Sequence, residues 1–206
     1  MIMRKVLLVF VAVLAAMSAF AGAGILRPVE VNIDVNNLPN GEYAVCFDPT
    51  QVKTTAKGNY IEFEIFTLDL FDAKLVNELE KGDCIIADDK MVVVKTVKKE
   101  EGYVSVNYGM EGMTDFGPYD KTHYIICGAN DNPTYTSQGK VKLLVPITVG
   151  MTDNGIDGDP MKTKVIKGSK LGYYLRHSWS NDFFQLNTTI TVKNGKVTKL
   201  TRNYLP

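Results

Sequence analysis

Three aspartates in a glycine-rich stretch are the residues of this sequence best suited to holding a metal ion. Asp153, Asp157 and Asp159 lie within TDNGIDGDP, and carboxylate oxygens are the hard ligands that Ca²⁺ prefers. The stretch is not an EF-hand loop, because Gly155 occupies a ligand position and Lys164 stands where the closing glutamate belongs. The sequence predicts no other cofactor. A calcium site is therefore one hypothesis, and a solvated loop whose aspartates cap turns is the alternative.

The second candidate site is the aromatic segment LGYYLRHSWSNDFF, residues 171–184. Aromatic faces beside amide, carboxylate and guanidinium groups are what a protein uses to stack on a sugar or a peptide. The segment predicts a ligand site, with the single tryptophan as stacking platform, built from Tyr173, Tyr174, Arg176, His177, Trp179 and Asp182. The alternative is that the aromatic side chains belong to the core and the polar residues between them face water.

The sequence marks out no catalytic residues. His123 and Cys127 are four residues apart, which is about 13 Å along a strand and too far for proton transfer. A pair formed across strands by His177 with Cys84 or Cys127 is left open. There is no Gly-x-Ser-x-Gly turn, no His-Glu-x-x-His motif and no Cys-x-x-Cys motif. Enzymatic activity is uncertain on these grounds, and a non-catalytic protein is the favoured interpretation.

The cysteines leave two interpretations open. Cys46, Cys84 and Cys127 each lie in an apolar stretch, and their wide spacing resembles no zinc pattern. They form either one disulfide with a leftover thiol or three small buried side chains.

The N-terminus predicts export. Arg4 and Lys5 precede an apolar run from Val6 to Met17, and Ala19 and Ala21 supply the small residues of a signal-peptidase site. We therefore expect residues 1–21 to be a cleaved signal peptide. An uncleaved anchor is the alternative, but the run is shorter than the about 20 apolar residues of a membrane span. The expected location is periplasmic or secreted, without a membrane span in the mature chain.

The charge balance excludes some partners. The chain has 23 lysines and arginines against 23 aspartates and glutamates, and loss of Arg4 and Lys5 leaves a small acidic excess. Binding to nucleic acid or to an anionic membrane needs a surplus of lysine and arginine on one face. The expected partner is therefore a glycan or a protein outside the cytoplasm, and not a nucleic acid.

Alternation of apolar and polar residues predicts β-strands over most of the chain. The predicted strands are residues 29–35, 43–47, 58–71, 84–87, 91–97, 103–108, 122–129 and 140–150, and residues 187–204 predict a closing hairpin. Asn194-Gly195 supplies the two left-handed residues that its type I′ turn needs. One short helix is predicted within residues 71–83, where Asp72 caps the start and Gly82 follows the end. Residues 130–139 are expected to form a loop.

These patterns predict an all-β, mainly antiparallel fold, a small barrel or sandwich with one short helix, in a single domain of residues 22–206. The favoured function is an exported, non-catalytic β domain that binds a glycan, an envelope component or a protein. One alternative is an assembly protein that pairs through an edge strand such as Val29–Val35. The other alternative is a secreted hydrolase.

Overall fold

The computed structural model describes residues 24–87, 90–127, 133–154, 162–178 and 182–203. The predicted signal peptide, residues 1–21, lies outside these ranges. No helix within them is long and apolar enough to cross a membrane.

The described residues divide into two compact units, each with its own hydrophobic core. Unit 1 contains the described residues up to Val29 and those from Asp69 to Thr134. Unit 2 contains Glu30–Leu68 and the described residues from Tyr135 onward. The sequence predicts one domain, and whether the two units unfold as one cooperative domain stays a prediction.

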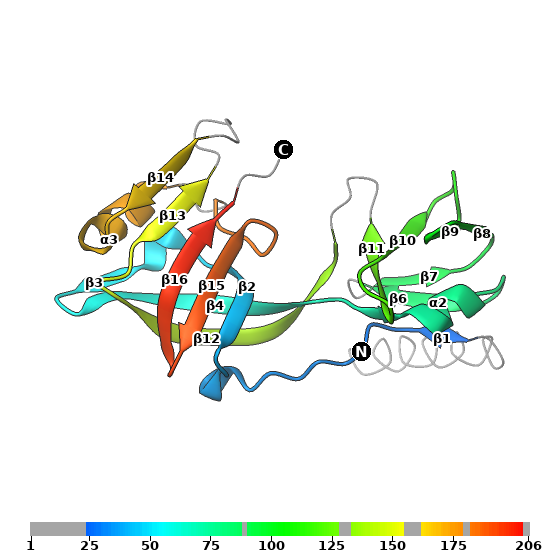
Figure 1. The fold of residues 1–206 in the computed structure, drawn as a ribbon, viewed down its shortest axis with the longest axis horizontal. Coiled ribbons are helices and arrows are strands. Elements are labelled where there is room, and N and C mark those ends of the chain that lie inside the picture. Colours follow the sequence, from blue (N-terminus) through cyan, green and yellow to red (C-terminus); the bar gives the residue numbers. More distant parts are fainter. Residues whose placement is uncertain (1–23, 88–89, 128–132, 155–161, 179–181, 204–206) are drawn as a thin grey trace, which may run out of the picture. The chain divides into compact units, whose positions relative to one another are not determined.

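Unit 1 consists of two small sheets and one helix (Figure 1). A three-stranded sheet has the order β1-β6-β7, and a five-stranded sheet has the order β5-β11-β10-β9-β8. The elements are β1 (Ile25–Leu26), β5 (Phe71–Asp72), α2 (Ala73–Glu78), β6 (Cys84–Ala87), β7 (Lys90–Val93), β8 (Val97–Glu100), β9 (Tyr103–Val106), β10 (Thr114–Pro118) and β11 (His123–Cys127).

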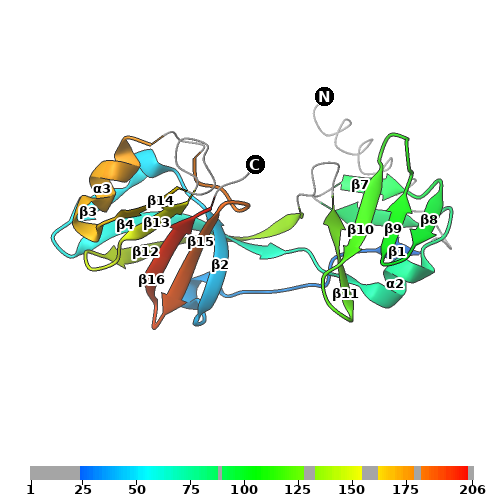
Figure 2. The ribbon, with the colours of Figure 1, turned by 45° about the horizontal axis from the view of Figure 1, so that its top comes forward.

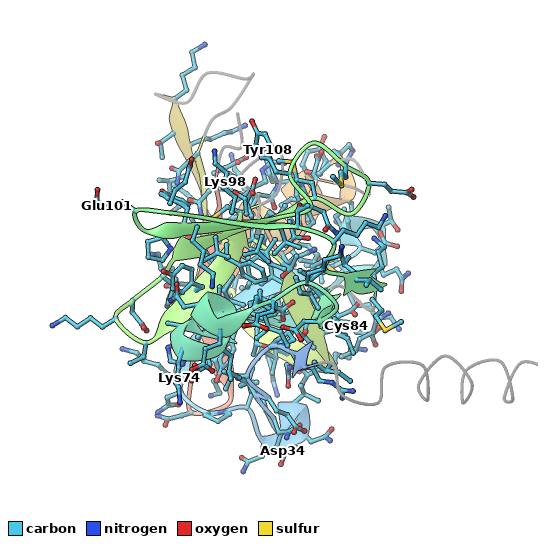
Figure 3. The ribbon with its side chains drawn as sticks, turned by 90° about the vertical axis from the view of Figure 1, so that its right-hand side faces the viewer. Asp34, Lys74, Cys84, Lys98, Glu101 and Tyr108 are labelled. Atoms are coloured by element: carbon cyan, nitrogen blue, oxygen red, sulfur yellow. The ribbon has the colours of Figure 1, made fainter. Side chains whose placement is uncertain are left out.

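The core of unit 1 lies around two fully buried rings, Phe71 and Phe116, which meet edge to face with their centroids 5.2 Å apart. Asp72 caps α2 as predicted, since its carboxylate accepts hydrogen bonds from the backbone N–H groups of the first turn. On the surface, the ammonium group of Lys98 lies 5.4 Å from the ring centroid of Tyr108 (Figure 3).

Unit 2 is built on an eight-stranded sheet with the order β12-β4-β2-β15-β16-β13-β14, in which β3 also pairs with β4. Strand β12 contacts β16 as well, so the sheet curls into a half-barrel (Figure 1). Its elements are η1 (Val35–Asn37), β2 (Gly41–Cys46), η2 (Pro49–Gln51), β3 (Lys53–Thr55), β4 (Gly58–Leu68), β12 (Tyr135–Pro146), β13 (Met151–Asn154), β14 (Thr163–Ile166), α3 (Gly168–Arg176), β15 (Thr188–Lys193) and β16 (Lys196–Arg202).

Alternation along β4 gives the sheet of unit 2 two different faces. Ile61, Phe63 and Ile65 are almost completely buried in the core. Glu62 and Glu64, the residues between them, point to the opposite face, because successive side chains of a strand alternate. Strand β4 therefore supplies the core on one side and acidic side chains on the other.

The prediction of an all-β, mainly antiparallel fold is confirmed, and so is the closing hairpin. Asn194 and Gly195 have φ angles of 50° and 69°, as a type I′ turn requires. Figure 2 shows the hairpin strands β15 and β16 beside β2.

Three details of the predicted elements are wrong. Residues 29–34 form no strand, and Val35 belongs to the 3-10 helix η1, which Asp34 caps by accepting a hydrogen bond from the backbone of Asn36. The strand predicted at 91–97 is interrupted at residues 94–96, so that its parts belong to β7 and β8. Strand β12 begins at Tyr135, within the segment predicted as a loop.

The sequence did not predict the helix α3, nor the strands β1, β3, β10, β13 and β14. No side chain caps the start of α3, where Lys167 is the N-cap residue, and the helix contains Gly172. A Cβ atom at Gly172 would lie 2.1 Å from the Thr54 hydroxyl and 2.4 Å from the Asn59 side-chain oxygen. The glycine therefore lets the helix pack closely on β3 and β4, and the same residue weakens the helical pattern in the sequence.

Candidate functional site

A pocket of about 690 Å³ opens in unit 2 beside the face of the sheet that carries the acidic side chains of β4. Its volume is within the range of pockets that hold small ligands. Side chains of β2, β4 and β12 line one part of the pocket, and residues 183–185 line another. The lining residues are Cys46, Phe47, Asp48, Gln51, Glu62, Glu64, Lys140, Phe183, Phe184 and Gln185.

Strand pairing places three of these side chains in one row across the sheet. Cys46 of β2 and Lys140 of β12 are both register partners of Glu64 on β4. The Cys46 Sγ atom lies 3.7 Å from Glu64 Oε2, and Lys140 Nζ lies 4.0 Å from the same oxygen. The Ser137 hydroxyl donates a hydrogen bond of 2.7 Å to Glu64 Oε1. Glu64 is thus the centre of the polar part of the pocket.

The thiol in this row is a poor nucleophile at neutral pH. Burial, followed by the charge of Glu64 and its hydrogen bond with the thiol, raises the pKa of Cys46 to about 11, and the opposing effect of Lys140 is smaller than each of these. A thiol reacts as the thiolate, which this environment disfavours. Neither His123 nor His177 lines the pocket. The Cys–His pair left open by the sequence is therefore not found here.

We expect iodoacetamide to alkylate Cys46 more slowly than an ordinary cysteine at mildly alkaline pH. The Glu64→Gln variant should react about 3 to 10 times faster, because removing the neighbouring charge lowers the pKa of the thiol. The rate can be read from the Cys46 peptide by mass spectrometry. Glu62→Gln is the matched control, since it removes the same charge two residues away. Equal rates for the two variants would contradict the assignment of Glu64.

A short segment after α3 forms the apolar wall of the pocket. Phe183 is buried, and its ring stacks on Phe47 with the centroids 4.6 Å apart. The backbone N–H of Phe184 donates to the Asn187 side-chain oxygen at 3.0 Å, and the Asn187 amide donates to the backbone of Asp182 at 2.9 Å. Phe184 is partly exposed and lines the pocket. These bonds fix the wall in place.

Asn187, with Thr188 and Thr189, also matches the acceptor pattern for N-glycosylation. Its side chain is only 8% exposed and its amide is used in the bonds just described. The residue supports the pocket wall in this structure and offers no surface for a glycan to be attached.

A buried ion pair lies behind the wall. Arg202 donates to both oxygens of Asp153 at 2.8 Å, from Nε and from Nη2, and Asp153 is completely buried. The Tyr174 hydroxyl donates to Asp153 Oδ2 as well. Arg202 also reaches Asp182 at 3.3 Å, and its guanidinium lies 5.1 Å from the ring centroid of Phe183. Burial, followed by the hydrogen bond to Asp153, raises the pKa of Tyr174 to about 12.

Of the three predicted calcium ligands, only Asp153 lies within the described residues, and both of its oxygens accept hydrogen bonds from protein groups. Asp157 and Asp159 lie outside the described residues. Within the described ranges, no group of three or more His, Cys, Asp or Glu side chains is placed to hold a metal ion. The calcium site stays a prediction.

The described residues of the predicted aromatic site fall into separate groups. The ring centroids of Tyr173, on α3, and His177, the residue that follows α3, lie 4.1 Å apart, and both residues are exposed. Tyr174 and Asp182 belong to the buried cluster of Asp153 and Arg202. Arg176 donates a hydrogen bond of 2.8 Å to Thr54, and Trp179 lies outside the described residues.

The same aromatic segment contributes to the pocket through its last two residues, Phe183 and Phe184. The sequence did not point to the rest of the lining, such as Cys46, Glu64 and Lys140. The alternation over residues 58–71 did place the two glutamates of β4 on one face. It did not indicate which strands pair with β4, and this pairing is what creates the site.

The cysteines are all described, and no disulfide joins them in the structure. Cys84 and Cys127 lie in unit 1 and Cys46 lies in unit 2.

No protein-family model, no curated protein and no solved structure matches this chain.

Proposed function

We propose that this chain is an exported, non-catalytic binding protein and that the pocket of unit 2 holds a segment of a glycan outside the cytoplasm. The observation that carries the proposal is the pocket itself, which combines a partly exposed aromatic ring with carboxylate and amide groups. Export is supported by the signal-peptide pattern of residues 1–21.

The lining suits a sugar because a pyranose ring has an apolar face and a rim of hydroxyl groups. Phe184 offers a ring for the apolar face, and Glu62, Glu64 and Gln185 offer oxygens that accept hydrogen bonds from hydroxyls. A sugar hydroxyl that is buried without a partner would lose affinity, so this density of acceptors favours a hydroxyl-rich ligand.

The binding role is favoured over covalent catalysis because the pocket thiol is kept protonated by burial and by Glu64. Val29–Val35, the example of an edge strand given for the assembly alternative, is not a strand in the structure, so it does not support that alternative.

One observation favours a second candidate, the secreted hydrolase. Glu62 and Glu64 lie two residues apart on the same face of β4, which separates their backbone positions by about 7 Å. The acid and base carboxyl groups of an inverting glycosidase lie about 6.5 to 9.5 Å apart, a distance that two side chains on backbones so spaced can span. In this reading the glycan that binds would also be cleaved.

The test is a titration of the secreted protein with neutral, acidic and amino-sugar oligosaccharides, followed by analysis of each mixture for cleavage. We expect at least one oligosaccharide to bind and to remain intact, and Glu64→Gln to weaken its binding about fivefold or more. Glu100→Gln, an exposed change in unit 1, should leave the affinity unchanged. Cleavage lost in both Glu62→Gln and Glu64→Gln would favour the hydrolase, and an absence of binding across the panel would overturn the proposal.

A further inference from the structure

The charges that line the pocket of unit 2 are unbalanced. Three carboxylates line it, those of Asp48, Glu62 and Glu64, against one cation, Lys140. The Asp48 carboxylate accepts bonds from Thr50 and from the Gln51 side chain, which lower the pKa of Asp48 and keep it charged. The pocket therefore carries an excess of negative charge next to its apolar wall.

Lys140 compensates this charge only weakly. Its ammonium lies 4.0 Å from Glu64 Oε2, at the outer limit of an ion pair, and 63% of its side chain is exposed. Exposed ion pairs of this kind contribute little to stability, because water and salt screen them. Glu62 has no hydrogen-bond or ion-pair partner among the described residues. Glu62 is thus available to a ligand, and Glu64, whose Oε1 accepts from Ser137, can offer Oε2, which has only the long contacts with Cys46 and Lys140.

The two central strands of the floor do not offer their backbones to a ligand. Strand β2 pairs with β4 and with β15, while β4 pairs with β2 and with β12. Strand β12 is the edge of the sheet order, and it contributes only Lys140 to the lining. A peptide that binds by strand addition needs a free sheet edge. The groups that β2 and β4 present to the pocket are therefore side chains, which suits a compact ring with polar substituents.

We propose that the pocket recognises a glycan with a free primary amine, such as a de-N-acetylated hexosamine residue, whose ammonium group lies between Glu62 and Glu64 while its ring packs on Phe184. This inference rests on the proposed function, because it names the class of glycan that the same pocket binds. An ammonium group supplies three N–H donors and one positive charge, which match two carboxylates on one face. A neutral N-acetylated sugar would leave those carboxylates partly desolvated without a counter-charge.

The experiment compares two tetrasaccharides that differ only in their amine groups. Glucosamine tetramer and N-acetylglucosamine tetramer are titrated into the secreted protein by calorimetry, at mildly acidic pH where the amines are protonated. We expect the glucosamine tetramer to bind at least about tenfold more tightly, and its affinity to fall at high salt. Glu62→Gln and Glu64→Gln should each weaken that binding about fivefold or more, and Glu100→Gln should not change it.

The other outcomes of this experiment would overturn either the amine inference or the proposed function. Equal affinities for the two tetramers would overturn the amine inference and leave the glycan proposal standing. Binding of a tetralysine peptide as tightly as the glucosamine tetramer would overturn it as well, since the cation alone would then suffice. If no oligosaccharide binds at all, the proposed function itself fails. Circular dichroism of each variant confirms that a loss of binding is not a loss of fold.

Discussion

Replacing Asp153 with alanine should lower the free energy of unfolding of unit 2 by about 3 to 5 kcal/mol, the usual cost of breaking a buried ion pair. The carboxylate is completely buried and accepts two hydrogen bonds from Arg202 and one from Tyr174. Its removal leaves a guanidinium group, only 19% exposed, without its main counter-charge. Urea denaturation followed by circular dichroism measures the change. Glu111→Ala, an exposed change in a turn of unit 1, is the control.

A double-mutant cycle separates two contributions to the free energy of unfolding: the interaction within the ion pair, and the cost of leaving one buried charge without its partner. We expect Asp153→Ala combined with Arg202→Met to be less destabilised than Asp153→Ala alone, because the second change removes the uncompensated cation. Additive losses would contradict this account and would mean that the two side chains contribute independently.

The buried pair also connects stability to the proposed site. Arg202 contacts Asp182 and the ring of Phe183, so that it supports the wall of the pocket from behind. Asp153 was predicted from the sequence as a calcium ligand, and within the described residues it is instead the anchor of this support. Variants that disrupt the pair of Asp153 and Arg202 should therefore also bind the ligand more weakly, although neither residue lines the pocket.

Local signals in the sequence predicted the elements whose stabilising contacts are themselves local. The hairpin turn at Asn194-Gly195 needs only two residues with left-handed backbone angles, and the cap of α2 needs only Asp72 and the next turn. The alternation at Val29–Val35 was misleading, because a strand also needs a partner strand and the sequence does not show whether one is present. The uncapped helix α3 lacked the start signal that would have revealed it.

The candidate site was less predictable than the fold because it depends on pairing between distant segments. Cys46, Glu64 and Lys140 are far apart in the chain and form a row only through the register of β2, β4 and β12. The aromatic segment stands out in the sequence, yet its described residues serve several purposes. Phe184 lines the pocket, Tyr174 stabilises a buried carboxylate and Tyr173 lies on the surface. Residue type alone does not distinguish these roles.

The second large effect is expected in unit 1, where Asn107→Ala should lower the free energy of unfolding by about 3 to 5 kcal/mol. The buried side chain makes four hydrogen bonds with partly buried backbone groups, and each is worth roughly 1 kcal/mol. Asn107 is 1% exposed. Its side-chain oxygen accepts from the backbone of Lys95 and Thr96 at 2.7 and 3.3 Å, and its amide donates to Val93 and Gly112 at 2.9 and 3.3 Å.

Asn194 provides the matched control for Asn107. Both asparagines have a left-handed backbone, with φ angles of 50° and 54°, but Asn194 lies in an exposed turn. Asn194→Ala should therefore cost only the about 1 kcal/mol of forcing alanine into that conformation. Chemical denaturation of the two variants gives the comparison, and similar losses would show that backbone conformation, and not the buried hydrogen bonds, sets the cost at Asn107.

The Asn107 variant also tests how the chain is divided. The cores of the two units share no residue, so we expect Asn107→Ala to increase amide hydrogen exchange in unit 1 and to leave unit 2 protected. Mass spectrometry of peptides from β9 and β10 against peptides from β4 and β12 would show the difference. Exchange that rises equally in both sets would instead support one cooperative domain, as the sequence predicts, because local destabilisation would then reach every residue through global unfolding.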